Sequence, residues 1–161
     1  MIASLPMYDR AETRGATDRL WDGIARALGE QGIAAPAALA RDGDPWPHWR
    51  APDLLLSQTC GLPFRATLHE TLTLVATPDY ALPGCPAGHY HSVIVSRPGA
   101  TRRDSARLAF NDGLSQSGWA AALDWGAGTG QRFGSLLQTG AHAASARAVA
   151  EGRADLAAID A

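Results

Sequence analysis

Apolar residues follow two alternating patterns along this chain of 161 residues. Short continuous apolar runs are typical of buried strands, and apolar positions three and four residues apart are typical of amphipathic helices. Strands that alternate with helices predict βαβ units and an α/β fold with mostly parallel sheets. The predicted strands are residues 2–8, 37–41, 53–58, 71–77, 92–96, 108–111, 133–139 and 154–161, and the predicted helices are residues 16–28 (ending near Gly29 or Gly32), 118–125 and 141–151.

A turn-forming stretch, Arg97-Pro98-Gly99-Ala100, interrupts this alternation after the predicted strand 92–96. Proline and glycine side by side disfavour both helix and strand. The alternation starts again beyond this stretch, so the sequence predicts two α/β lobes, residues 1–98 and 99–161. A chain of this length is sufficient for one ordinary domain or two small lobes.

Composition narrows the class of protein. Apolar residues make up 46% of the chain and charged residues 19%, which predicts a folded globular protein. The net charge is -2 and the sequence has no basic run, so we expect no nucleic-acid partner. No apolar stretch approaches the length of about 20 residues that a membrane-spanning helix needs. The N-terminal residues lack the basic region of a signal peptide, so either a leader is already removed or the protein stays in the cytoplasm.

Two cysteines, Cys60 and Cys85, lie in turn-like segments beside glycine or proline. In an oxidising compartment they could form a disulfide, although two cysteines alone do not establish that pairing. The spacings Cys-x-x-Cys and His-x-x-x-His do not occur in the sequence, so we predict no metal site. Nothing in the sequence predicts a cofactor.

The strongest candidate for a binding site is the segment Ser115-Gln116-Ser117-Gly118-Trp119, between an apolar strand and a helix-forming run. The first N–H groups of a helix have no partners within it and carry the positive end of its dipole. Serine hydroxyls add donors, and glycine lets a ligand approach the backbone closely. The segment therefore predicts an anion-binding turn. The alternative is that Ser115 or Ser117 is simply the N-cap of the helix.

Polar residues also follow the ends of other predicted strands, where ligands bind in open α/β sheets. Tyr8, Thr59, His142 and Asp160 each lie at or just beyond such an end, and Tyr90 precedes the strand 92–96. Hydroxyl groups and an imidazole can donate hydrogen bonds to an oxyanion. A carboxylate faces an anion only at a cost, so Asp160 suits an amine, a hydroxyl or a shared proton. The alternatives are a helix-start role without a ligand for His142, and packing under the first helix for Tyr8.

Three motifs in the second half carry a family resemblance. They are the Ser-x-Ser-Gly of residues 115–118, the Gly-x-His of residues 140–142, and the run 148–160 with its Gly-Arg-Ala-Asp and a final small-residue strand ending in Asp. In this pattern the chain resembles the phosphate, phosphite and phosphonate substrate-binding proteins of ABC transporters. That family has the type II periplasmic binding-protein fold, in which two α/β lobes close on a ligand. Residues 2–8, 53–61 and 90–95 extend the likeness to the first lobe.

The resemblance implies particular site residues. Ser115, Ser117 and the amide of Gly118 match the phosphoryl cradle of the family, and His142 matches its helix-start histidine. Tyr90 and Asp160 match positions in the wall of the pocket. The resemblance also implies a periplasmic location.

The chain departs from the family pattern at three points. Gln116 stands where threonine is usual, which leaves the cradle intact. No leader or lipobox precedes the first strand, which makes the cytoplasm the alternative location. The chain stops at Ala161, where the family returns to the first lobe, so we expect a truncated C-terminal return.

These observations predict a solute-binding protein for a small oxyanion such as phosphate, phosphite or a phosphonate. Such a protein would deliver its ligand to an ABC permease and would have no catalytic activity. One alternative is an enzyme on the same fold, as in the menaquinone and thiamine pathways, with Cys60 as nucleophile beside a histidine. The other alternative is a cytoplasmic module that senses an anion.

Overall fold

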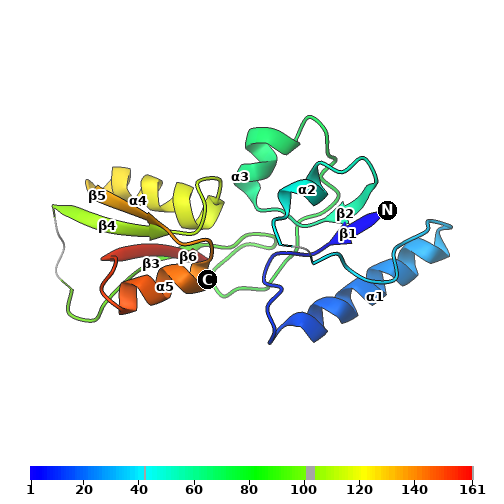
Figure 1. The fold of residues 1–161 in the computed structure, drawn as a ribbon, viewed down its shortest axis with the longest axis horizontal. Coiled ribbons are helices and arrows are strands. Elements are labelled where there is room, and N and C mark those ends of the chain that lie inside the picture. Colours follow the sequence, from blue (N-terminus) through cyan, green and yellow to red (C-terminus); the bar gives the residue numbers. More distant parts are fainter. Residues whose placement is uncertain (42, 101–103, 161) are drawn as a thin grey trace. The chain divides into compact units, whose positions relative to one another are not determined.

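The computed structural model describes residues 1–41, 43–100 and 104–160. This part of the chain is a mixed α/β protein with five α-helices, two π-helical turns and six strands (Figure 1). It divides into two compact units, Met1–Cys60 and Gly61–Ala161. The first unit contains β1 (Ile2–Ser4), α1 (Arg14–Glu30), α2 (Trp46–Trp49) and β2 (Leu54–Ser57). The second contains α3 (Gly61–Pro63), η1 (Phe64–Leu68), β3 (Ser92–Ser96), β4 (Ser105–Phe110), η2 (Gln116–Ala120), α4 (Ala121–Thr129), β5 (Arg132–Gln138), α5 (His142–Ala150) and β6 (Leu156–Asp160).

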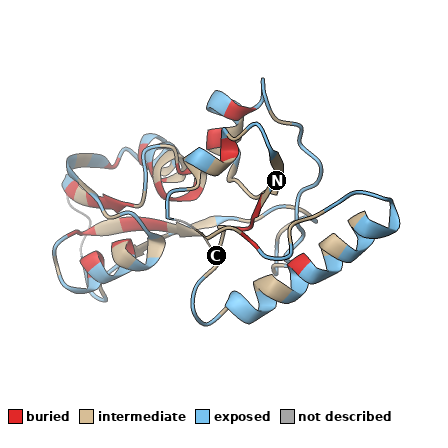
Figure 2. Ribbon diagram, turned by 45° about the vertical axis from the view of Figure 1, so that its right-hand side comes forward, coloured by how far each residue is buried: buried red, intermediate tan, exposed pale blue. Residues whose placement is uncertain are grey.

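In the first unit, β1 and β2 form a parallel pair that packs on one side of α1. Figure 2 shows most of α1 exposed, and Trp21 is its buried residue. Trp21 packs with Ala3, Leu5 and Leu39, and its indole N–H donates to the carbonyl oxygen of Pro36 at 3.1 Å. One large aromatic side chain therefore anchors the helix to this small sheet.

In the second unit, the strand order is β3-β6-β4-β5. β4 pairs in parallel with β5 and β6, and β3 is antiparallel to β6. The chain runs from β4 outward to β5 and then back past β4 to β6. Right-handed connections in opposite directions place their helices on opposite faces of a sheet. Figure 1 accordingly shows α4 on one face and α5 on the other.

The core of the second unit is built mainly from small residues. Ala109, Ala148, Ala154 and Ala157 are fully buried and form one cluster with Val149. Alanine on both surfaces lets the helix approach the sheet closely. On the other face, Leu108 packs with Ala122 and Ala158.

The sequence predicted the α/β class, the parallel pairing and most elements correctly, but two predicted strands are wrong. Residues 37–41 do not form a strand. Among the described residues, one backbone hydrogen bond joins this segment to β1, from the Ala40 amide to the Ala3 carbonyl, and one bond does not make a ladder. Residues 71–77 are also irregular, and they leave Leu74 and Val75 largely exposed. In the part of the chain that the structure describes, no strand pairs with this segment.

Two further expectations concern boundaries and length. The compact units meet at Cys60 and Gly61, whereas the sequence placed a lobe boundary between Pro98 and Gly99. The difference arises because η1 is hydrogen-bonded to η2 and β3 pairs with β6, so both segments belong to the second unit. The first strand is also shorter than expected, because β1 ends before Pro6, which lacks an amide N–H. In the described part of the chain, no helix has both the length and the apolar character needed to cross a bilayer.

Candidate functional site

The candidate site lies at the carboxyl edge of the four-stranded sheet. β4, β5 and β6 run parallel, so their carboxyl ends share this edge, and the antiparallel β3 begins there with Ser92 opposite Asp160. The helical segments η2 and α5 also start at this edge, directly after β4 and β5. Strand order changes direction between β4 and β6, and such a point is where open α/β sheets bind ligands.

Three side chains from three elements meet at this edge. The Oγ of Ser117 in η2 lies 2.9 Å from Nε2 of His142 in α5. The same Nε2 lies 3.3 Å from Oδ1 of Asp160 at the end of β6. Ser117 is 4% exposed, and the side chains of His142 and Asp160 are 22% and 9% exposed. The cluster is therefore largely shielded from water.

Both contacts of the imidazole use one nitrogen. In a Ser-His-Asp triad the serine and the carboxylate bind opposite nitrogens of the ring, so that the acid orients the base. Here Ser117 and Asp160 share Nε2, and Nδ1 of His142 is buried without a hydrogen-bond partner in the described part of the chain. With a proton on Nε2, the Ser117 hydroxyl oxygen accepts from it, and the hydroxyl proton of Ser117 is left for an external acceptor.

Gly118 stands where a larger residue does not fit. A Cβ atom at this position would lie 1.9 Å from Oδ1 of Asn111 and 3.1 Å from Cε1 of His142. Asn111 immediately follows β4, and its Oδ1 is buried without a partner in the described part of the chain. Sequence reasoning missed Asn111, although its position just beyond an apolar strand could have indicated it.

Ser115 acts as the N-cap of η2. Its Oγ accepts a hydrogen bond from the Gly118 amide at 2.9 Å, so this amide is already bound within the turn. The N-cap interpretation is therefore correct for Ser115. Ser117 instead directs its hydroxyl to His142.

The start of α5 supplies the second helix terminus. Thr139 Oγ1 lies 2.7 Å from Ser145 Oγ, and the Gly140 amide donates to the Asn111 carbonyl at 3.0 Å. These bonds hold the turn between β5 and α5 against the end of β4. The N-cap residue, Ala141, makes no side-chain cap hydrogen bond. The positive end of the α5 dipole therefore lies beside His142 without a side-chain acceptor from its own N-cap.

Tyr80 is a second residue that sequence reasoning missed. It lies in the irregular segment between η1 and β3, and partial burial of its side chain raises the pKa of the phenol. The negative charge of Asp160 raises the same pKa further. No local sequence pattern indicates that Tyr80 lies near Asp160, because the two residues are far apart in the chain. Tyr90, which was predicted, precedes β3 by two residues and so lies near the same edge.

Gln116 and the cysteines make other contacts. The Oε1 of Gln116 accepts from Nη2 of Arg65 at 2.8 Å, which ties η2 to η1.

The structure has Cys60 and Cys85 as two thiols rather than as a disulfide. The Sγ of Cys85 lies 3.1 Å from Nδ1 of His91. No group of three or more His, Cys, Asp or Glu side chains that could hold a metal ion occurs in residues 1–41, 43–100 and 104–160.

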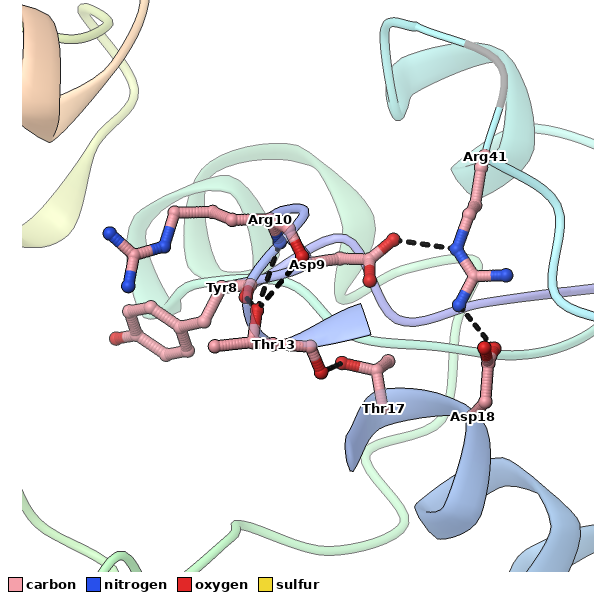
Figure 3. A network of polar contacts seen from close by, with 7 residues as sticks. All are labelled: Tyr8, Asp9, Arg10, Thr13, Thr17, Asp18 and Arg41. Carbon is pink, nitrogen blue, oxygen red and sulfur yellow. Dashed lines mark hydrogen bonds and ion pairs between the residues drawn. The ribbon is translucent and has the colours of Figure 1, made fainter. Parts of the chain in front are cut away.

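Two predicted ligand residues, Tyr8 and Thr59, belong to the first unit and follow its two strands. Tyr8 is 43% exposed and has a φ of 66°, a left-handed conformation that is uncommon for tyrosine. The hydroxyl of Thr13 donates to the Tyr8 carbonyl and holds this turn. Figure 3 shows the Tyr8 ring on the side of the turn away from Arg41. Thr59 Oγ1 donates to the Cys60 carbonyl at 3.2 Å.

A guanidinium group braces the same turn of the first unit. Nε of Arg41 lies 2.7 Å from Oδ2 of Asp9, and its Nη2 contacts Asp18 (Figure 3). The hydrogen bond to Asp9, followed by that to Asp18, raises the pKa of Arg41. Arg41 therefore stays charged and fixes the chain after β1.

The fold and the site define an α/β protein with a polar cluster at the carboxyl edge of parallel strands. No protein-family model matches the chain, and a search of curated proteins gives no match. The polar cluster and the sequence motifs are therefore the features that bear on function.

Proposed function

We propose that this protein binds a small oxyanion such as phosphate, phosphite or a phosphonate, as a solute-binding protein of the type II periplasmic fold that supplies an ABC transporter. The observation that carries the proposal is the convergence of Ser117, His142 and the start of α5 at one sheet edge. The Ser117 hydroxyl and the amides at the start of α5 are hydrogen-bond donors, and donors are what an oxyanion requires.

The local geometry supports this proposal in two ways. The contact between Ser117 and His142 leaves a hydroxyl proton for a ligand when Nε2 carries the ring proton. Gly118 has no Cβ, so the side chains of Asn111 and His142 can lie close to the backbone beside this contact. The type II fold and the transport role rest on the resemblance of the motifs at residues 115–118, 140–142 and 148–160.

Titration calorimetry with phosphate, phosphite, methylphosphonate and sulfate tests the proposal. We expect binding of at least one phosphorus oxyanion, and we expect Ser117→Ala to weaken it by roughly 1–3 kcal/mol, the cost of a lost hydrogen bond to a charged group. Ser135→Ala is the matched control, because Ser135 is an exposed serine on β5 of the same unit. An affinity unchanged by Ser117→Ala would contradict the assigned site.

An enzyme on the same fold is the second candidate. The observation in its favour is that Ser117 Oγ lies within hydrogen-bond distance of the His142 imidazole, as a nucleophile and its base must. The shared use of Nε2 by Asp160 argues against a triad. Turnover of activated ester or phosphoester substrates that is lost in Ser117→Ala would favour the enzyme.

A further inference from the structure

We propose that Cys85 and His91 form a thiol-modification site, at which the thiol exchanges with a low-molecular-weight disulfide and becomes a mixed disulfide. Both residues lie in the segment before β3, and neither belongs to the cluster of Ser117, His142 and Asp160. The inference is therefore independent of the proposed function. It adds a covalent modification that oxyanion binding does not require.

The contact between the two functional groups carries the first step. The Sγ of Cys85 lies 3.1 Å from Nδ1 of His91. Cys85 is partly exposed and His91 is exposed, so the pair lies on a surface that a small molecule can approach. Reactive cysteines occupy partly exposed positions of this kind, beside a histidine or another basic group.

Two turns of the backbone bring the thiol and the imidazole together. The Cys85 amide donates to the Leu82 carbonyl at 3.1 Å, and the His89 amide donates to the Pro86 carbonyl at 3.0 Å. Gly88 in the second turn has a φ of 72°, a left-handed conformation that glycine adopts without strain. Hydrogen bonds of the main chain therefore hold the loop that carries the thiol.

The exchange needs only this pair and the incoming disulfide. When Nδ1 carries no proton, it accepts the proton of the thiol, and the sulfur becomes the negatively charged nucleophile. This sulfur attacks one sulfur of the disulfide, so that a new S–S bond forms while the original S–S bond breaks. The leaving thiolate takes the proton from the imidazolium and departs as a thiol. The sulfur of Cys85 is oxidised and the leaving sulfur is reduced, so the disulfide is the oxidant.

The sequence around the pair suits an anionic disulfide. Residues 80–91 contain two histidines and no acidic residue. Glutathione disulfide carries a net negative charge, and no carboxylate within this loop opposes its approach. Glutathione disulfide is therefore a suitable probe of the site.

The experiment measures the reaction of Cys85 in a Cys60→Ser protein, where it is the one cysteine of the sequence. We expect glutathione disulfide to add a single glutathione, which intact-mass measurement detects and a reductant removes. Because a free thiol is only slightly ionised at neutral pH, we expect His91→Gln to slow this reaction by about tenfold. His89→Gln is the matched control, because His89 is exposed in the same loop and its Nδ1 contacts the Ala87 carbonyl.

Chemical rescue distinguishes a base from a structural contact. Free imidazole should restore part of the rate in His91→Ala, because it can accept the proton in place of the missing side chain. A rate that falls in His91→Ala and does not respond to imidazole would give His91 a structural role and overturn its part in the exchange.

Other outcomes would overturn the proposal as a whole. They are equal rates in His91→Gln and His89→Gln, and a Cys85 thiol that does not react with glutathione disulfide. A disulfide between Cys60 and Cys85 in protein purified without reductant would also overturn it, since no free thiol would remain at the site. If Cys60→Ser does not fold, trypsin cleavage of the reacted wild-type protein after Arg65 separates the two cysteines, and mass spectrometry locates the adduct.

Discussion

The two parallel sheets of this protein use their carboxyl ends differently. In the first unit, the carbonyl of Tyr8 accepts a hydrogen bond from Thr13 within its own turn, and the carboxylate of Asp9 binds Arg41. In the second unit, side chains from η2, α5 and β6 meet one another, with Ser117 and Asp160 on one imidazole nitrogen.

The difference follows from the number of strands. A pair of parallel strands has one crossover connection. In this unit the residues after β1 form the turn that leads into α1. Three parallel strands with connections in opposite directions bring two helical starts and a strand end to one place. A convergent polar site therefore needs the change in strand order, and a polar residue at a strand end does not suffice.

The largest expected effect comes from filling the space at Gly118. The new Cβ atom in Gly118→Ala would overlap Oδ1 of Asn111 and press on His142, so both side chains must move. We expect the free energy of unfolding to fall by about 1–3 kcal/mol, as for overpacked interiors. Urea unfolding followed by circular dichroism measures the change.

The control for this substitution is Gly128→Ala in α4, where a Cβ atom has no heavy atom within 4 Å. We expect that variant to be unchanged or up to about 1 kcal/mol more stable, since alanine favours helix. Addition of Asn111→Ala to Gly118→Ala should recover part of the loss, because it removes the nearest overlapping atom. Equal stability of the two glycine variants would show that the second unit does not pack tightly at its site.

A smaller effect is expected when Arg41 is replaced in the first unit. Arg41→Met leaves the carboxylate of Asp9, which is 10% exposed, without its guanidinium partner. Removal of one partner from a fully buried pair costs about 3–5 kcal/mol. Because Arg41 is itself 24% exposed, solvent screens the pair and we expect a loss of about 1–2 kcal/mol in thermal or urea unfolding.

Arg26→Met is the matched control, since Arg26 lies exposed on α1. Surface substitutions of this kind usually change stability by less than about 0.5 kcal/mol. If Arg41→Met and Arg26→Met change the free energy of unfolding equally, the turn after β1 does not depend on its ion pair. The difference between the two sheets would then no longer include a stabilising ion pair in the first unit.

Local sequence signals predicted the elements that local chemistry determines. The helix at α1 follows from its apolar spacing, and the turn at Ser115 follows from capping chemistry within four residues. The contact of Ser117 with His142 required one further step, namely that parallel strands end at a common edge. These parts of the site can be predicted from the sequence alone.

Other features depend on partners that the sequence does not reveal. The apolar residues Leu74 and Val75 predicted a strand, but a strand forms only where another strand supplies its hydrogen bonds. The hydrogen bond from Arg65 to Gln116, which lies within the predicted anion-binding turn, joins residues 51 positions apart in the sequence. The approach of Tyr80 to Asp160 is likewise a tertiary contact between distant segments.

The smallest effect concerns that contact. Because both burial and Asp160 raise the pKa of Tyr80 above its ordinary value of 10.0, the folded protein favours the neutral phenol. The contribution of the neutral Tyr80 phenol to the free energy of unfolding is therefore complete below about pH 10. This contribution is lost as the pH rises through the raised pKa. In a protein carrying Tyr8→Phe and Tyr90→Phe, Tyr80 is the one tyrosine of the sequence left to titrate. Ultraviolet absorbance of the phenolate then reports its pKa directly.

Asp160→Asn should lower this pKa without restoring the ordinary value, since burial is the larger cause and stays in place. Asp124→Asn, which removes an exposed carboxylate on α4, should leave it unchanged. A pKa of Tyr80 that does not change in Asp160→Asn would show that the segment before β3 does not lie near Asp160. The side chains that meet at this edge would then come from η2, α5 and β6, without a contribution from the segment before β3. The difference from the first unit would then rest on those three elements.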